Sequence, residues 1–322
     1  MTIMRSETLQ VVLASPRGFC AGVRRAIETV ERALALGAGP VYVRHEIVHN
    51  KQVVERLSAR GAIFVDELFE IPDGALAIFS AHGVPQAVER EAARRGLDVI
   101  DATCPLVHKV HKQAQRYAQR GYDIVVVGHA EHIEVIGTVG QIPGAVSVVG
   151  SVADVAGVVV RDPARVAYVT QTTLSVGDTR HIIAALRQRF PAIVGPDTRD
   201  ICYATHNRQQ AVVELARRAE CILVIGSGNS SNSNRLREIG EAAGIASYLV
   251  ERPAAIDPAW LDDVSVVGVT AGASVPEDLV EEAIACLGAI RPIAIESLTG
   301  VVEDVVFRLP ARIGGPDAPA LA

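Results

Sequence analysis

Three of the five cysteines share one sequence context, because each ends a strand-like run and opens a helix-like run. Cys20 closes LQVVLASPRGFC, Cys104 closes LDVIDATC, and Cys202 closes TRDIC. A thiolate at a helix start is stabilised by the positive end of the helix dipole, which suits metal ligation or catalysis. The repeated context predicts three cysteines that act together; the alternative is that each is a small buried hydrophobe.

The spacing of these cysteines limits the metal that they can hold. They lie 84 and 98 residues apart, and no CxxC pair is present, which disfavours a structural zinc site. An iron–sulfur cluster accepts thiolates from distant parts of a chain. Three thiolates on a four-iron cluster leave one iron open, where it can act as a Lewis acid on a substrate oxygen. Cys221, at the start of CILVIG, and Cys286, on an apolar helical face, are predicted core residues.

Polar loops after strand-like runs form a second group of candidates. Two are rich in Ser, Asn and Gly, GSGNSSNSNRL (Gly226–Leu236) and TAGASVPED (Thr270–Asp278), and a third is TQTTLS (Thr170–Ser175). Such loops present backbone N–H groups and hydroxyls to an anion at a helix start. The alternative is helix capping, since Ser274 and Glu277 fit a capping box. No Walker A or GxGxxG pattern occurs, so nucleotide binding is not favoured.

Histidines and one glutamate also follow strand-like runs, in VRHEIVHN, SAHGVP and GHAEHIE. Histidine hydrogen-bonds phosphate in either protonation state. Glu134 is the carboxylate closest to these motifs, and an acid beside an anion site is a plausible proton donor. The alternatives are surface or capping histidines and a solvated glutamate at a helix start.

The elements that position these residues are short apolar strands separated by amphipathic helices. Runs buried on both faces and spaced by helices predict an α/β fold with mostly parallel sheets. Open α/β sheets bind ligands at the carboxyl ends of their strands, so cysteines at strand ends can converge. The predicted strands are Leu9–Ala14, Leu76–Phe79, Ile124–Val127, Val166–Thr170, Cys221–Ile225 and Val264–Thr270. The clearest helical patterns span 23–34, 107–117 and 212–219, and a further helix is predicted over 235–243.

The division of the chain is predicted from the cysteines. Its 322 residues suggest about two domains by length, whereas the cysteine spacing suggests three modules of roughly a hundred residues. The predicted domains are residues 1–103, 104–201 and 202–289. Residues 311–322, rich in Gly, Pro and Ala, are predicted to be disordered.

Composition excludes several classes of protein. The 31 Lys and Arg residues against 37 Asp and Glu give a net charge of −6, which with 4% aromatic residues argues against nucleic-acid binding. No signal peptide or membrane span is recognisable, so a cytoplasmic protein is expected. An odd number of cysteines in a reducing compartment argues against a disulfide framework.

Ordered motifs spread over residues 11–307 resemble the 4-hydroxy-3-methylbut-2-enyl diphosphate reductases. In chain order they are PRGFCAGV, VRHEIVHN, SAHGVP, DATCPLV, TQTTLS, DICYATHNRQ, GSGNSSNSNRL and TAGAS. The resemblance implies a cloverleaf of three similar α/β domains around a central iron–sulfur cluster. Residues 290–310 would pack back on the first domain. Gly228 stands where many members of the family have Lys.

The resemblance also implies roles for individual residues. The expected ligands of one 4Fe–4S cluster with an open iron are Cys20, Cys104 and Cys202. Glu134, with His132 and Thr172, would supply protons. The expected substrate-binding residues are His49, His82, His132, Thr172, Ser230, Ser231, Asn232 and Ser274.

The activity implied is the last step of the methylerythritol phosphate route to isoprenoids. The allylic hydroxyl of (E)-4-hydroxy-3-methylbut-2-enyl diphosphate binds the open iron and is lost as water after two electrons and two protons are added. The products are isopentenyl and dimethylallyl diphosphate. Expected partners are this small substrate and an electron-donor protein, ferredoxin or flavodoxin, with no nucleic acid and no membrane. A non-catalytic phosphometabolite-binding protein with buried cysteines is the main alternative. A nicotinamide-dependent dehydrogenase is weakened by the missing GxGxxG.

Overall fold

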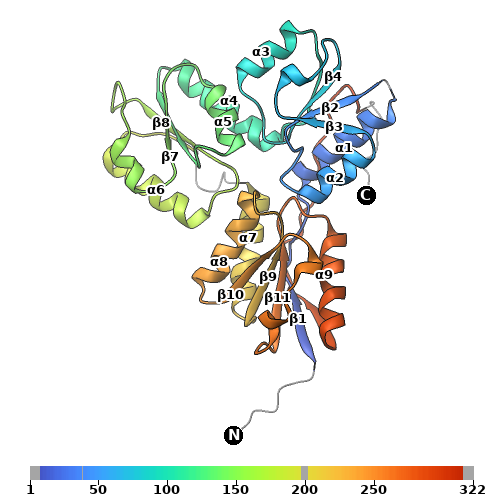
Figure 1. The fold of residues 1–322 in the computed structure, drawn as a ribbon. Helices are drawn as coiled ribbons and strands as arrows, with labels where there is room; N and C mark the ends of the chain where they lie inside the picture. The colour runs from blue at the N-terminus through green and yellow to red at the C-terminus, as the bar shows by residue number, and fades with distance from the viewer. Residues whose placement is uncertain (1–7, 38, 197–201, 315–322) are drawn as a thin grey trace. The chain divides into compact units, whose positions relative to one another are not determined.

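The computed structural model describes residues 8–37, 39–196 and 202–314. Within these ranges the strands form three separate sheets, and helices connect most successive strands (Figure 1). Every pairing between neighbouring strands in these sheets is parallel. The predicted α/β class is confirmed.

The largest sheet has five strands and joins both ends of the chain. In spatial order they are β10 (Ala246–Val250), β9 (Cys221–Ile225), β11 (Val266–Ala271), β1 (Leu9–Leu13) and β12 (Ile293–Ser297). Three helices accompany it: α7 (Tyr203–Ala216), α8 (Ser231–Ala242) and α9 (Glu277–Ile290).

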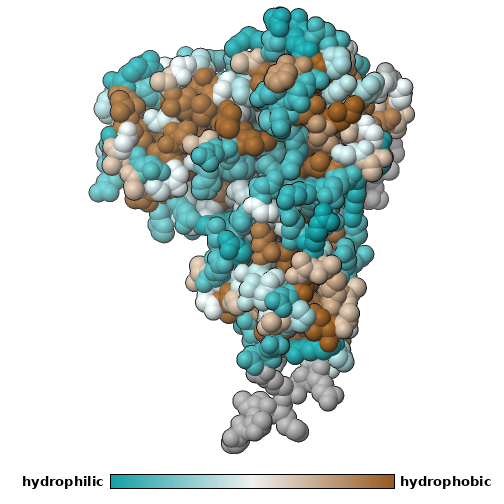
Figure 2. Space-filling view, viewed as in Figure 1, coloured by the Kyte–Doolittle hydropathy of each residue, from teal (hydrophilic) through white to brown (hydrophobic). Residues whose placement is uncertain are grey.

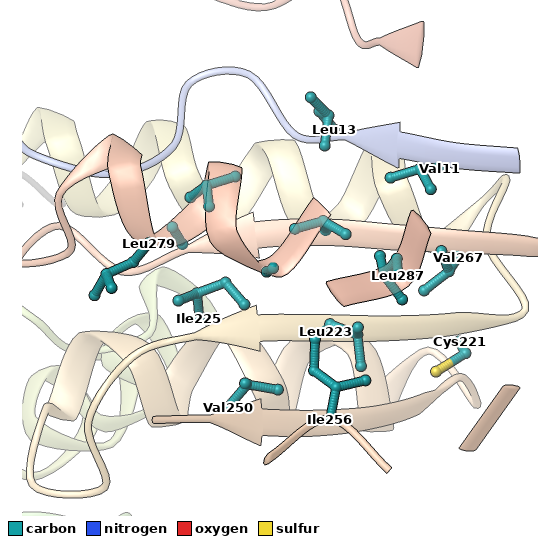
Figure 3. Packing of buried hydrophobic residues seen from close by; sticks show 14 of the residues in the cluster. Val11, Leu13, Cys221, Leu223, Ile225, Val250, Ile256, Val267, Leu279 and Leu287 are labelled. Carbon is teal, nitrogen blue, oxygen red and sulfur yellow. The ribbon is translucent and has the colours of Figure 1, made fainter. Parts of the chain in front are cut away.

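The two faces of this sheet are buried by different helices. Alternate residues of a strand point to opposite faces. Val11 and Leu223 therefore pack on Leu287 of α9, in the cluster shown in Figure 3. Val12 and Val224 belong to the cluster that contains Leu215 of α7. The valine-rich strands lack polar alternation because both faces are covered.

The second sheet has four strands, in the order β3 (Ala62–Val65), β2 (Val41–Arg44), β4 (Leu76–Phe79) and β5 (Asp98–Asp101). The helices in this part of the chain are α1 (Ala21–Ala35), α2 (Lys51–Ala59) and α3 (Gln86–Arg94). Phe79 and Ala77 lie in a buried cluster with Ala92 of α3.

The third sheet has three strands, in the order β7 (Val146–Val149), β6 (Asp123–Val127) and β8 (Val166–Thr170). Its helices are α4 (Pro105–Gln119), α5 (Ile133–Gly140) and α6 (Val176–Arg189). Tyr168 and Leu186 of α6 share one buried cluster, whereas Val169, Ala114 of α4 and Val135 of α5 share another. Helices thus cover both faces of this sheet as well.

The chain divides into two compact units. Unit 1 combines the described part of Met1–Cys20 with His49–Lys51 and Tyr203–Val305; unit 2 combines Ala21–Val48, Gln52–Cys202 and the described part of Val306–Ala322. The five-stranded sheet lies in unit 1, and the other two sheets lie in unit 2. Strands β1 and β12 pair directly with each other. The domain boundaries at residues 103, 201 and 289, and the cloverleaf arrangement, stay predictions.

Most predicted strands are observed within one or two residues of their expected ends. The structure differs from the prediction at one helix start and in the C-terminal tail. Helix α8 begins at Ser231, earlier than the predicted start at Arg235. Residues 311–314 form a turn in which Ile313 is buried, so within the described residues the tail is ordered as far as Gly314. The rest of the predicted disordered tail lies outside the described residues.

In the described ranges, no helix combines the length and apolar character that a membrane span requires. The face drawn in Figure 2 carries polar residues throughout, with apolar patches between them.

Candidate active site

In unit 1, three neighbouring strands deliver the candidate residues to one edge of the sheet. Strands β9, β11 and β1 are adjacent, and each is followed by one of the polar or cysteine-bearing loops. Cys20 comes directly before α1, as the strand–cysteine–helix pattern predicted. The Gly18 and Cys20 amides donate to the carbonyls of Ala271 and Ala273, both at 3.2 Å. The first cysteine therefore lies beside the TAGAS loop.

The loop after β9 passes directly into the first turn of α8. Ser230 is the N-cap of α8, and its hydroxyl accepts a hydrogen bond from the Ser233 amide at 3.3 Å. Ser231 and Asn232 consequently belong to the helix and not to a loop. Asn232 is 4% exposed, and neither its side-chain oxygen nor its nitrogen has a hydrogen-bond partner among the described residues.

An unpartnered buried amide costs free energy, because both of its polar atoms have lost water. A bound anion would accept a hydrogen bond from the amide nitrogen. The loop after β11 lies very close to the start of α8, because a Cβ at Gly272 would overlap the Ser233 hydroxyl. Gly272 is required here because Ser233 occupies the space of a side chain.

Ser274 makes a contact that rules out the capping alternative. Its hydroxyl donates to the His49 carbonyl at 2.9 Å, whereas α9 begins at Glu277 with Pro276 as an N-cap that makes no side-chain bond. The Lys51 amide donates to the Ser227 hydroxyl at 3.4 Å. The segment that carries His49 is thus held against both polar loops. Together these groups supply hydroxyls, an amide and the α8 N-terminus, which suit a small anion.

A buried arginine fixes the backbone upstream of Cys20. The Arg208 side chain is 1% exposed and donates to the Gly18 carbonyl at 2.7 and 2.9 Å. It also forms an ion pair with Glu303 at 3.0 Å. Gly18 has a φ of +66°, which is why glycine is suited to this position. Helix α7 and residue 303 therefore hold the loop that presents the first cysteine.

In unit 2, a buried carboxylate and a threonine predicted as catalytic residues lie in direct contact. Glu134 is 2% exposed and lies in the first turn of α5, directly after the loop that follows β6. Its Oε1 accepts a hydrogen bond from the Thr172 amide at 2.7 Å, and its Oε2 accepts one from the Thr172 hydroxyl at 2.8 Å. Thr172 follows β8, which neighbours β6. The predicted glutamate and threonine are brought together, and the solvated-glutamate alternative is wrong.

Two predicted histidines lie near this pair. His132 is the N-cap of α5, where its Nδ1 accepts a hydrogen bond from the Glu134 amide at 3.2 Å. His82 hydrogen-bonds with the Ser80 hydroxyl through Nδ1 at 3.2 Å. The two imidazole rings lie edge to face with 6.3 Å between centroids. His132 thus lies beside the start of the helix that carries Glu134, and His82 lies against His132.

Cys104 and Cys202, both in unit 2, stand at the other two predicted helix starts. Cys104 is the N-cap of α4 with Pro105 following, and its amide donates to the Ala81 carbonyl at 3.0 Å. Cys202 directly precedes α7 and lines a small cavity with Thr172. The run TRDI that was expected to precede Cys202 as a strand lies outside the described residues.

The charges near Cys104 come from an arginine and an aspartate. Arg25 donates to the Thr103 carbonyl at 3.0 Å, directly before the cysteine. Burial lowers the pKa of Arg25, although the nearby Asp101 and Cys104 act to raise it. Burial opposes ionisation of Asp101, but hydrogen bonds from His108 and Thr103 outweigh it and hold the pKa of Asp101 below its usual value. A fixed cation therefore lies close to the second cysteine.

Thiols at helix starts are the kind of donor that an iron–sulfur cluster takes. All five cysteines are free thiols, and the three at helix starts are partly exposed. Cys221 is buried in β9, where burial raises the pKa of its thiol to about 11, and Cys286 packs against the same core. The prediction of a core residue is confirmed for Cys221, whereas Cys286 is partly buried. Across the described ranges, no three His, Cys, Asp or Glu side chains group closely enough for one metal ion. Ligands of a multi-iron cluster need not group so closely, because each thiolate binds a different iron.

Sequence reasoning missed Arg208 and Gln171. Gln171 is 2% exposed, and its side-chain oxygen accepts a hydrogen bond from the His129 amide at 3.0 Å. Its place within TQTTLS could have marked it. Arg208 had no such signal, since an arginine in a helix is ordinarily solvated.

Parallel sheets with polar loops and cysteines at the carboxyl ends of their strands define an α/β protein whose strand ends are suited to ligand binding. A family model described as "LytB protein" matches residues 11–288, and the chain belongs to this family. A 4-hydroxy-3-methylbut-2-enyl diphosphate reductase of Burkholderia pseudomallei is 58% identical over 95% of this chain and 97% of its own. One from Zymomonas mobilis is 55% identical over 95% of this chain and 90% of its own.

Two solved structures are also similar. The E-1-hydroxy-2-methyl-but-2-enyl-4-diphosphate reductase from Plasmodium falciparum has a TM-score of 0.90 at 37% identity, covering 95% of this chain and 97% of that chain. The second is an (E)-4-hydroxy-3-methyl-but-2-enyl diphosphate reductase, described as the terminal enzyme of the non-mevalonate pathway. It has a TM-score of 0.62 at 32% identity, covering 88% of this chain and all of that one.

Proposed function

We propose that this protein reduces (E)-4-hydroxy-3-methylbut-2-enyl diphosphate to isopentenyl and dimethylallyl diphosphate, the last step of the methylerythritol phosphate pathway. The observation that carries the proposal is 55–58% identity, over about 95% of the chain, to reductases of that name. The reaction replaces a C–OH bond by C–H, consumes two electrons and two protons, and releases one water.

The cofactor in this proposal is one 4Fe–4S cluster held by Cys20, Cys104 and Cys202. When bound, it supplies single electrons and an open iron that acts as a Lewis acid on the substrate hydroxyl. The partly exposed thiols at helix starts support this assignment. Arg25, near Cys104, supplies positive charge that offsets part of the negative charge of a thiolate-bound cluster.

The diphosphate is bound by the polar loops of unit 1 and by the nearby histidine. Ser230, Ser231 and Asn232 stand at the start of α8, where backbone N–H groups and the helix dipole favour anions. Ser274 and His49 are joined by a hydrogen bond and complete this group. Binding energy from the diphosphate, which does not react, is available to orient the hydroxyl end.

Protons are delivered by the residues gathered in unit 2. Glu134 passes a proton to the Thr172 hydroxyl, which lies 2.8 Å from its Oε2 and relays the proton because a hydroxyl both donates and accepts. His132 orients the start of α5 through the Glu134 amide, and His82 and His132 present imidazoles to the substrate. Protonation of the substrate hydroxyl lets it leave as water. Without a proton it would have to leave as hydroxide, which is too basic to be a good leaving group.

The electron donor in this proposal is a ferredoxin or a flavodoxin, and the enzyme acts in the cytoplasm. A phosphometabolite-binding protein without catalysis is not favoured, because it leaves unexplained a buried glutamate held by Thr172 beside two histidines.

The proposal is tested with protein purified and reconstituted without oxygen. We expect four iron and four sulfide per chain, a broad thiolate–iron absorption near 400 nm, and oxidation of reduced methyl viologen only when the substrate is added. A fully loaded protein that leaves the substrate intact would refute the function. Binding of pyrophosphate by protein that takes up no iron would favour the non-catalytic alternative.

A further inference from the structure

Helix α4 carries a row of cations that the reaction itself does not use. Lys109, Lys112, Arg116 and Arg120 recur at intervals of three and four residues, so they share one face of the helix and its C-cap, and all four are exposed. They border a groove of about 630 Å³. Its other lining residues are Pro105, His108, Gln113 and Tyr117, and none is acidic.

This face differs from the charged face of α8. On α8, Arg235 pairs with Glu238 and Arg237 with Glu241, so the helix neutralises its own cations. On the α4 face, by contrast, no carboxylate of the described ranges pairs with Lys112 or Arg116. The chain as a whole carries a net charge of −6, so a cationic groove of this size is a local exception.

The groove begins where one of the candidate cluster ligands lies. Cys104 is the N-cap of α4, and Pro105 and His108, in the first turn, already line the groove. With a rise of 1.5 Å per residue, Lys112 and Arg116 lie roughly 12 and 18 Å along the axis from Cys104. A protein seated over the first turns would lie close to that cysteine.

We propose that this basic α4 face is the docking surface for an acidic protein that carries a one-electron redox centre. The inference rests on the proposed function, because only a reductase needs such a partner. Two partner molecules are each oxidised by one electron per turnover. The two electrons, with two protons, reduce C–OH to C–H and release water, so electrons and atoms balance.

The charge distribution favours an acidic protein over a nucleic acid. A polynucleotide site usually adds aromatic residues for stacking, and Tyr117, half-buried in α4, is the one aromatic residue that lines this groove. Complementary charge mainly raises the rate of encounter and fixes orientation, and its effect falls with ionic strength. Those properties suit an electron carrier, because two carrier molecules must dock and leave in each catalytic cycle.

The test compares two electron sources on the same holoenzyme. The variant is Lys112→Glu/Arg116→Glu, and its matched control, with the same change of charge, is Arg180→Glu/Arg187→Glu on the exposed face of α6. The donors are a reduced acidic [2Fe–2S] ferredoxin and dithionite-reduced methyl viologen, a small cation that needs no docking surface.

We expect the ferredoxin-supported kcat/KM of the α4 variant to fall about tenfold or more at low salt, with the viologen-supported rate unchanged. The control should keep both rates, and added salt should slow the wild type more than the α4 variant.

Equal ferredoxin rates in variant and wild type would overturn docking here, as would an equal loss in the viologen assay. A mixed-sequence oligonucleotide gives the remaining outcome. If it binds in a salt-sensitive way, if only the α4 variant loses this binding, and if the ferredoxin rates are unchanged, the face binds polyanions instead. Failure of the wild type with viologen would overturn the reductase function itself, and the docking inference with it.

Discussion

Glu134 and Thr172 lie 38 residues apart in the chain but meet because they follow two neighbouring strands. The Thr172 amide and hydroxyl each hold one carboxylate oxygen, so the side chain has a single orientation. A catalytic acid needs this fixed geometry as much as it needs a suitable pKa.

The role of this carboxyl is tested by Glu134→Gln. The amide occupies the same space but cannot release a proton, so we expect turnover to fall about 10²-fold or more while the iron content and absorption stay unchanged. Glu131→Gln, at an exposed position one turn earlier, is the control and should turn over normally. Turnover of Glu134→Gln near the wild-type rate would remove this residue as the proton donor.

A second residue-scale test concerns Asn232, whose buried amide makes no hydrogen bond with the described residues. Because nothing is lost in the unliganded protein, Asn232→Ala should change the free energy of unfolding by less than about 1 kcal/mol. A hydrogen bond to a charged group is worth roughly 1.5–3 kcal/mol, so affinity for inorganic pyrophosphate should fall about 10-fold to 100-fold by calorimetry.

The isosteric variant Asn232→Asp sharpens this test. Its carboxylate would repel the anion, so pyrophosphate should bind still more weakly than to Asn232→Ala. Unchanged affinity in both variants would place the diphosphate away from the start of α8.

At the scale of elements, Arg208 ties helix α7 to the loop before Cys20 and to Glu303. Arg208→Met would leave the Glu303 carboxylate, which is only 14% exposed, without its cation. Breaking a buried pair in this way costs about 3–5 kcal/mol. We therefore expect a loss of that size in chemical denaturation, and a lower iron content because Gly18 loses its anchor.

Removing both charges provides the control for this prediction. Arg208→Met/Glu303→Gln should recover part of the lost stability, since no uncompensated charge remains buried. A single Arg208→Met variant that unfolds within 1 kcal/mol of the wild type would contradict the structural role assigned to this arginine.

Helix α4 makes the stability of the protein depend on pH through His111. Burial lowers the pKa of this imidazole to about 4, and a side chain at Gly83 would collide with its ring. An unfolded histidine binds a proton near pH 6.5. Between pH 6.5 and 4 the unfolded chain therefore binds more protons, so this contribution is complete above pH 6.5 and declines as the pH falls toward 4.

The two pKa values correspond to a loss of about 3 kcal/mol across this interval. Urea unfolding from pH 7 to pH 4 should show a shallower decline for His111→Gln than for the wild type. His181→Gln, at an exposed position on α6, should follow the wild-type curve. Parallel curves for His111→Gln and the wild type would show that His111 does not contribute.

Local sequence patterns were sufficient to predict the strands, but they did not locate every helix start correctly. Runs such as Val166–Thr170 are recognisable because both faces of the strand are buried. The start of α8 was placed too late, because Ser, Asn and Gly favour loops by composition, whereas here Ser230 caps a helix that begins at once. Ser274 fitted a capping box, yet its hydroxyl is taken by a carbonyl 225 residues away. Contacts of that range leave no local signal.

At the scale of the whole molecule, the strand–cysteine–helix pattern was the most informative feature of the sequence. It correctly separated the three thiols at helix starts from Cys221, which is buried in a strand, and from Cys286, which packs against the same core. It did not show that β1 and β12, from opposite ends of the chain, pair in one sheet with β9–β11. That pairing is set by burial over long range, which no spacing of motifs encodes.

The assignment of the candidate site also depends on how residues distribute between units. The loops proposed to bind the anion and Cys20 belong to unit 1, whereas the group proposed to donate protons, Cys104 and Cys202 belong to unit 2. The motifs identified these residues individually. Which of them share a unit follows from the order of strands in each sheet, and this order became known only with the structure.

The central claim is that Cys20, Cys104 and Cys202 hold the cluster with which this protein reduces an allylic diphosphate. The most direct test is the yield of isopentenyl and dimethylallyl diphosphate, measured by mass spectrometry, from five single Cys→Ala variants reconstituted without oxygen. We expect Cys221→Ala and Cys286→Ala to form both products, and each of the other three to form about a hundredfold less, as loss of a ligand implies. Full product formation by any of those three variants, or none by iron-loaded wild type, would contradict the claim.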